Sequence, residues 1–287
     1  MPPIRRRAAA HDNGVEKVQR VQQVRLRCCV AGVGLALVAL FARSASGQIL
    51  PRAVPAPPQS GFLTRSDFSF TLGLLGSDDP RFTGVGRAKG DIDALDFGSG
   101  RANFTFDYEG VLGGEHHAFE LNHGNYFLES SLSRRFGDLE AAFVFHHVSR
   151  HLTDREEDGS ISWNVFGGRA IGRWAAATWT IDGQVDLGYV YQPHFVDYTW
   201  VSALGVALRR PMNGRAAAFL GARGELNKVT GEVRDHGPCG ARIEGGIKLR
   251  GVKSDIEIYG AYERRIDAYP TERTRVRFAE FGIRLFS

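Results

Sequence analysis

The sequence predicts an all-β protein: a transmembrane antiparallel β-barrel that follows a cleaved signal peptide. Three observations support this class. Apolar and polar residues alternate along many short stretches, the connections between stretches alternate between tight and long, and the last stretch carries an apolar stripe on one face. We expect about 10–12 strands, with twelve favoured because single-chain bacterial barrels have even strand numbers.

Residues 1–47 have the layout of a secretory signal. The apolar run Cys28–Ala42 follows several arginines and precedes small residues, and cleavage is expected after Gly47. The run is short for a spanning helix, although a single anchoring helix remains an alternative. Its removal also changes the sign of the net charge. The leader holds eight Lys and Arg but two Asp and Glu, which leaves 28 basic and 30 acidic residues. We therefore expect no nucleic-acid partner.

Residues 48–61 contain four prolines and predict an extended periplasmic lead-in, and residues 62–287 form the predicted barrel. Cys239 is then the only cysteine, so no disulfide can form within the processed chain. The sequence shows no amphipathic helix pattern of useful length in this region. The strand-like stretches are Ser66–Leu75, Asn103–Leu112, Tyr126–Phe136, Leu139–Ser149, Ser160–Ile171, Ala175–Tyr191, Asp197–Arg209, Arg215–Leu226, Ala241–Leu249, Asp255–Arg264 and Arg275–Phe286, with a further one within Phe82–Phe97.

The connections fall into two kinds. Tight turns are expected at 137–138, 172–173, 211–214 and 251–254, and longer charged loops at 150–159, 192–196, 228–240 and 266–274. Short periplasmic turns and long extracellular loops are typical of outer-membrane barrels. The predicted location is therefore the outer membrane, with membrane lipid as the surrounding partner.

The alternation alone also fits a soluble sandwich, in which the apolar face is buried in a core. The final stretch favours the barrel, because Phe281, Ile283 and Leu285 share one face. It resembles the C-terminal strand that outer-membrane proteins present to their assembly machinery, a predicted partner, although Ser287 follows the aromatic Phe286 here. Rows of both charge signs, such as Arg242, Glu244 and Lys248, are then expected to face the lumen and neutralise one another.

The hairpin from Leu139 to Ile171 carries the candidate chemistry. Side chains alternate across a strand, so His147 and Ser149 share a face with Phe143 and Phe145. Asn164 continues the corresponding stripe on the returning strand. A serine nucleophile needs a base, and the base needs a third group that fixes its tautomer. The three polar residues therefore predict a Ser-His-Asn triad that faces membrane lipid.

The pattern His147-x-Ser149, a polar loop and then Ser162-Trp163-Asn164 resembles the active-site hairpin of the outer-membrane phospholipase A family. The resemblance implies a twelve-stranded barrel that uses calcium and dimerisation. It also implies that Ser149 is the nucleophile, that His147 is the general base and that Asn164 orients the base. Ser160 matches a calcium-site serine. Where the family follows its serine with Asn-Gly, this chain has Arg150-His151.

Other interpretations remain open. The chain has a weaker likeness to the lipid A deacylases, which also carry His-x-Ser on a barrel strand. Asp154 and Asp158 in the charged loop offer hard oxygen ligands for Ca²⁺ but equally suit a solvated loop tip. A second cluster, from Glu115 to His123, has His and carboxylate groups that suit zinc. The alternative to an esterase is a non-catalytic barrel, either a structural protein or a narrow channel.

Overall fold

The computed structural model describes residues 60–115, 117–153, 161–230, 239–269 and 275–287. The predicted signal peptide, 1–47, and almost all of the predicted lead-in, 48–61, lie outside these residues. Within them no helix is long and apolar enough to cross a membrane. The strands are β1 (Gly61–Gly76), β2 (Gly84–Asp96), β3 (Arg101–Gly113), β4 (Glu120–Phe136), β5 (Leu139–Leu152), β6 (Ile161–Ala176), β7 (Trp179–His194), β8 (Tyr198–Pro211), β9 (Ala216–Val229), β10 (Cys239–Arg250), β11 (Asp255–Arg265) and β12 (Val276–Phe286).

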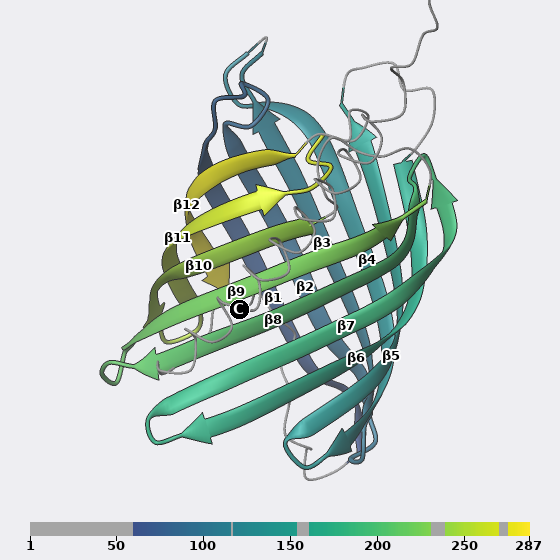
Figure 1. The fold of residues 1–287 in the computed structure, drawn as a ribbon. Coiled ribbons are helices and arrows are strands. Elements are labelled where there is room, and N and C mark those ends of the chain that lie inside the picture. The colour runs from purple at the N-terminus through teal and green to yellow at the C-terminus, as the bar shows by residue number, and fades with distance from the viewer. Residues whose placement is uncertain (1–59, 116, 154–160, 231–238, 270–274) are drawn as a thin grey trace, which may run out of the picture.

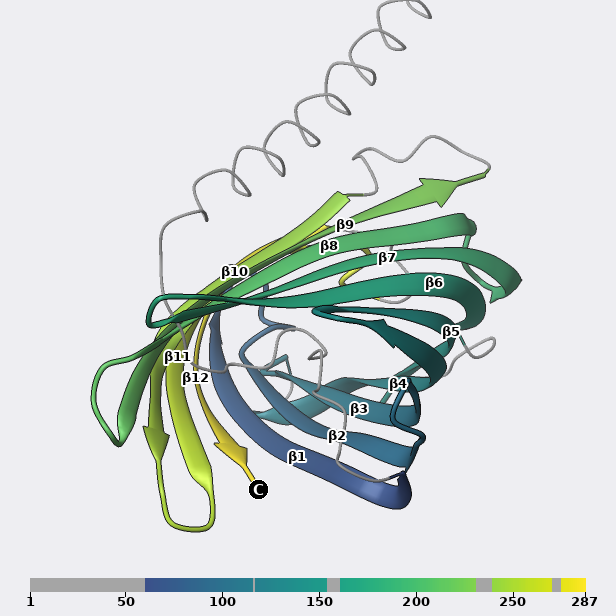
Figure 2. The ribbon, with the colours of Figure 1, turned by 90° about the horizontal axis from the view of Figure 1, so that it is seen from below.

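The twelve strands form a closed barrel, which confirms the predicted fold class and the favoured strand number. Every strand pairs in antiparallel fashion with its neighbours in the chain, as Figure 1 shows. The first and last strands close the ring, with Ser69 of β1 opposite Phe286 of β12. Seen from below, the strands surround a common interior (Figure 2). Closure leaves no unpaired strand edge, which is the condition for a β-structure to lie in lipid.

The two ends of the barrel differ as expected. Turns of two to four residues, such as Gly137-Asp138 between β4 and β5, join the strands at one end, and most connections at the other end are longer. The longer loop predicted at 192–196 is wrong, because β7 continues to His194 and only residues 195–197 separate it from β8. Gly137 has a φ of 63°, a conformation that favours glycine in a two-residue hairpin turn. Gly61 lies opposite Asp96, next to the short β2–β3 connection, so the described chain starts and ends at the tight-turn end.

The predicted turn at Gly172-Arg173 is wrong. The β6–β7 hairpin continues past it and turns at residues 177–178, where Ala177 has a φ of 56°. Gly172 instead makes room for an aromatic ring, because a Cβ at this position would lie 2.4 Å from the Trp174 ring. The glycine reflects close side-chain packing along a strand rather than chain reversal.

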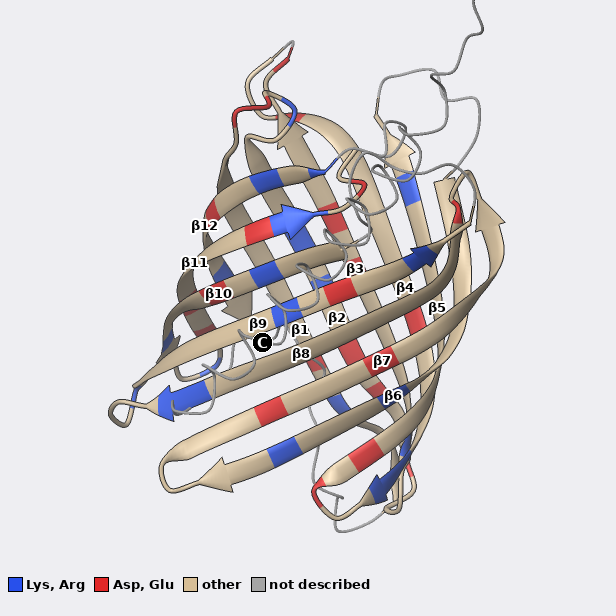
Figure 3. Cartoon of the chain, in the orientation of Figure 1, with Lys and Arg blue, Asp and Glu red and all other residues tan. Residues whose placement is uncertain are grey.

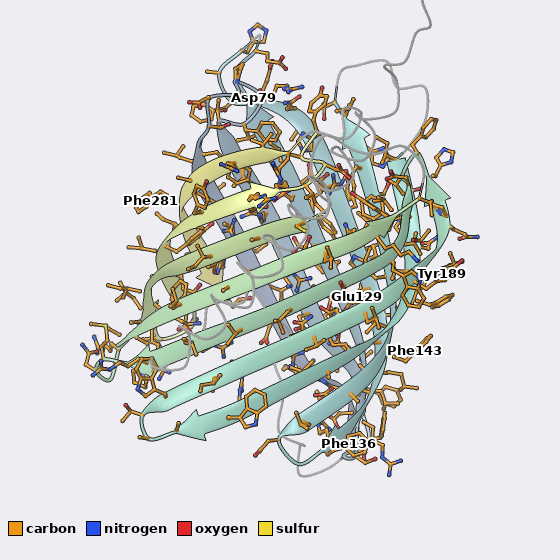
Figure 4. All side chains as sticks on the ribbon, in the orientation of Figure 1. Asp79, Glu129, Phe136, Phe143, Tyr189 and Phe281 are labelled. Carbon is orange, nitrogen blue, oxygen red and sulfur yellow. The ribbon has the colours of Figure 1, made fainter. Side chains whose placement is uncertain are left out.

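The outer surface of the barrel is apolar. Phe143, Tyr189 and Phe281 lie on the outline of the barrel in Figure 4, whereas Glu129 lies inside it. Phe143 and Phe281 are 60% and 61% exposed, values that would be unusual on a water-facing sheet but are expected beside lipid. Further large apolar side chains are exposed around the barrel, including Leu72, Leu132, Leu187, Leu204, Ile247 and Ile283.

Charged residues of both signs occur on neighbouring strands around the barrel (Figure 3), and many of them are buried in the lumen. Glu280 accepts hydrogen bonds from Arg87 at 2.8 Å and from Arg242 at 2.7 Å. Arg284 pairs with Glu244 and Glu257. The predicted mutual neutralisation of lumenal charges is therefore present. Glu257 of β11 and Asp182 of β7 are 0% exposed. Within the described barrel, no water-filled passage therefore runs past these two side chains.

Candidate functional site

The β5–β6 hairpin brings the predicted triad residues to one patch near the long-loop end. His147 lies directly opposite Asn164, and Ser149 lies opposite Ser162. On the other side of β5, Ser149 lies opposite Tyr126 of β4. The patch continues the outward face of the hairpin, which farther along β5 carries Phe143. The sequence alternation thus predicted both the face and the strand pairing.

His147 and Asn164 form a direct hydrogen bond. His147 Nδ1 lies 2.7 Å from Asn164 Oδ1, and Asn164 Nδ2 donates to Gln192 Oε1 of β7 at 2.7 Å. The second bond fixes the amide, so that its oxygen points to the imidazole. An amide oxygen can only accept, so Nδ1 must carry the hydrogen. The remaining ring nitrogen, Nε2, is then available as a base.

Gln192 is a participant that the sequence did not reveal. Its position depends on a β-bulge in the β6–β7 pairing, where the register shifts between Asn164 and Val165. The bulge places Gln192 opposite Asn164, while Tyr191 stacks on Phe166 with ring centroids 4.6 Å apart. Bulges aim side chains in a way that alternation patterns do not predict.

Ser149 is bonded to a different histidine from the one predicted. Its Oγ lies 2.8 Å from His151 Nε2, and among the described residues no hydrogen bond joins it to His147. His151 shares the outward face because it is two residues after Ser149. Its ring packs edge-on against Tyr126, with centroids 5.6 Å apart. Ser149 therefore lies between two imidazoles. Asn164 orients that of His147, and that of His151 is hydrogen-bonded to Ser149 itself.

The surroundings of the patch suit a membrane boundary. Tyr126 and Leu128, which lie opposite Ser149 and His147, are 44% and 42% exposed on the outer face. Farther round, Tyr189 packs edge-on against Trp200 at 5.4 Å. Tyrosine and tryptophan are typical of the level where lipid headgroups begin.

The metal-ligand predictions have different outcomes. Ser160, Asp154 and Asp158, the predicted calcium ligands, lie outside the described residues. The cluster from Glu115 to His123 is split: Glu120 accepts hydrogen bonds from the backbone of its own loop, and His123 is buried in the lumen between Phe82 and Tyr269. No group of three or more His, Cys, Asp or Glu suited to a metal occurs in the described part of the chain.

Solved structures of outer-membrane proteins resemble this chain in fold. Outer membrane phospholipase A from Escherichia coli matches with a TM-score of 0.50 and 12% identity, covering 77% of this chain and 92% of that chain. The NanC porin matches with a TM-score of 0.51 and 7% identity, covering 76% and 98%. The Salmonella typhi outer membrane phospholipase dimer with bound calcium matches with a TM-score of 0.49 and 13% identity, covering 77% and 89%.

No family model and no curated protein matches the sequence. At these identities, likeness to solved structures extends to the fold and no further. A closed twelve-stranded barrel, an apolar outer surface and a charged lumen together with that likeness show that the chain is an outer-membrane β-barrel, located in the bacterial outer membrane.

Proposed function

We propose that this barrel is a lipid esterase of phospholipase type, in which Ser149 attacks an ester, His147 acts as general base and Asn164 orients His147. The observation that carries the proposal is the 2.7 Å bond between His147 and Asn164 on the lipid-facing surface, beside a serine on the same strand face. Packing against lipid gives no reason for a serine, a histidine and an asparagine to meet on the outer surface. A nucleophilic serine, by contrast, needs a base and a third group that orients the base.

The reaction begins with rotation of the serine hydroxyl. In the resting state Ser149 Oγ is bonded to His151, and rotation about its χ1 angle would bring it towards His147 on the same face. Catalytic hydrogen bonds often form only in the substrate complex. We assign the base to His147 rather than His151 because, among the described residues, His147 alone of the two has a hydrogen-bonded partner that fixes its tautomer.

The proposed substrate is a membrane phospholipid. Ester groups of lipids lie just below the headgroups, and the aromatic residues around Tyr126 mark that level on this barrel. The apolar stripe that includes Phe143 would contact the acyl chains of the same lipid. Lipid A esters lie at a comparable depth and form the second substrate class to be assayed.

Calcium and dimerisation, which the sequence resemblance implies, are separate predictions. The three predicted ligands lie outside the described residues, and those described nearby contain no metal-suited group of three. We therefore assign calcium no step in the reaction. A non-catalytic structural barrel is the alternative function, and the buried ion-pair layer makes the narrow channel the weaker form of it.

The test is ester hydrolysis by the refolded protein in mixed micelles of phospholipid and detergent, with and without calcium. We expect activity in the wild type, none in Ser149→Ala, and wild-type activity in the control His146→Ala. His146 is the neighbouring histidine, but it faces the lumen, where its Nδ1 lies 3.4 Å from a carboxylate oxygen of Glu129. Absence of hydrolysis of both phospholipid and lipid A by the folded wild type would refute the proposal.

A further inference from the structure

Directly behind the β5–β6 hairpin, the loop-side half of the lumen contains a cavity of about 330 Å³. This volume is at the lower end of the range of small-molecule sites, roughly 300–1,000 Å³. The buried ion pairs around Glu257 close the lumen on the tight-turn side. The side chain of Glu225, which lines the cavity from β9, is 44% exposed, so solvent reaches the cavity.

One wall of the cavity is apolar, although the lumen of an outer-membrane barrel is ordinarily polar. Val148 of β5 and Trp163 and Val165 of β6 line it and belong to one buried cluster with Val190 and Tyr198. These positions alternate with His147, Ser149 and Asn164, so the wall is the inner face of the same hairpin.

Much of the remaining lining is charged, and most of these charges are paired. Arg169 bonds to Glu129 and Asp186, and Arg265 bonds to Glu109 and Glu263. The lining contains six arginines and five carboxylates, and Arg242 pairs in addition with Glu244 and Glu280 outside the lining.

Arg150 lines the cavity from β5. It donates to the backbone oxygen of Asp267 at 2.5 Å and lies over the Trp163 ring at 5.4 Å. It forms no ion pair with a carboxylate of the described residues. A cation at the edge of an apolar wall is complementary to an anionic headgroup that carries an acyl chain.

We propose that this cavity binds an amphipathic carboxylate with a single acyl chain. The carboxylate pairs with Arg150, and the chain lies along Val148, Trp163 and Val165. The proposal is independent of the esterase, because it concerns the opposite face of the hairpin and none of the triad side chains.

The experiment uses Trp163 as the reporter. The other three tryptophans, Trp174, Trp179 and Trp200, are replaced by Phe, and the barrel is placed in lipid nanodiscs. The probe is a medium-chain fatty acid with a terminal bromine, which quenches tryptophan on contact. We expect saturable quenching of Trp163. Arg150→Gln should weaken binding about tenfold or more, which is the usual loss for a charge-assisted bond. Arg150→Lys should retain most of the affinity.

Three controls separate lumenal binding from partition into the bilayer. Arg215→Gln, in the exposed β8–β9 turn at the other end of the barrel, should leave binding unchanged, and the brominated alcohol of equal length should bind at least about tenfold more weakly. A variant that keeps only Trp200, which faces lipid, reports partition. Quenching of Trp163 that rises without saturation in parallel with Trp200, or that is unchanged in Arg150→Gln, would overturn the proposal.

Discussion

His147 and Asn164 occupy directly opposite positions on β5 and β6, and their side chains meet on the lipid-facing surface with Nδ1 and Oδ1 2.7 Å apart. Such a bond between polar side chains on an otherwise apolar face fixes one imidazole tautomer. It also distinguishes His147 from His151, which contacts Ser149 but has no hydrogen-bonded partner on its other nitrogen among the described residues.

The two histidines should respond differently to substitution. His147→Ala should lower the rate of ester hydrolysis by about 10²–10⁴-fold, the usual contribution of a general base. His151→Ala should retain activity, because it removes a bond that holds Ser149 away from His147. Rates of both variants in the same micelles provide the measurement. Loss of activity in His151→Ala with retention in His147→Ala would assign the base to His151.

Asn164 should act through His147 and not on the substrate. Asn164→Ala should slow hydrolysis without abolishing it, since the imidazole loses its orientation but keeps its basicity. Asn164→Asp keeps an acceptor oxygen for Nδ1 and should retain activity. The pair of variants is compared by kcat at saturating lipid. Equal losses in both would indicate that the amide nitrogen, which donates to Gln192, is the required group.

The lumenal ion pairs should contribute to stability. Glu280 is 2% exposed and pairs with Arg87 and Arg242, so Glu280→Gln leaves two partly buried arginines with a weaker partner. Loss of one partner of a buried pair costs about 3–5 kcal/mol. Glu225→Gln, at a side chain that is 44% exposed, should cost less than about 1 kcal/mol. Urea unfolding in lipid vesicles measures both, and similar costs would contradict the buried network.

The long-loop end should face the outside of the cell. In a Cys239→Ser background, His117→Cys in the exposed β3–β4 loop should react with an impermeant maleimide on intact cells. Gly214→Cys in the exposed β8–β9 turn should react only after lysis. The opposite labelling pattern would mean that the barrel is inverted.

Much of this arrangement could be predicted because it follows from alternation. A period of two places His147 and Ser149 on the face of Phe143, and hairpin pairing then brings Asn164 opposite. Counting alternating stretches gave eleven strands and a possible twelfth within Phe82–Phe97, and the even strand number of single-chain barrels favoured twelve. The β6–β7 turn was missed because Gly172-Arg173 has the composition of a turn, whereas the glycine accommodates the Trp174 ring.

Other features depend on information that alternation does not carry. His151 was visible in the sequence, two residues after Ser149, but choosing between two histidines requires side-chain rotamers. The apolar inner wall could not be predicted from alternation. Val148 and Val165 lie on the inner face of the hairpin, but the outer face of the same hairpin is also apolar, as at Phe166, so the sequence pattern does not distinguish the two. Gln192 reaches Asn164 only because a bulge shifts the register on β7.

The central claim is that Ser149 is a nucleophile, and covalent labelling tests it most directly. The folded barrel in lipid nanodiscs is treated with a long-chain fluorophosphonate, and its peptides are examined by mass spectrometry. We predict one adduct, on Ser149 Oγ, which is present in His146→Ala and strongly reduced in His147→Ala. A folded wild-type barrel that carries no adduct on Ser149, or that labels equally well without His147, would contradict the account.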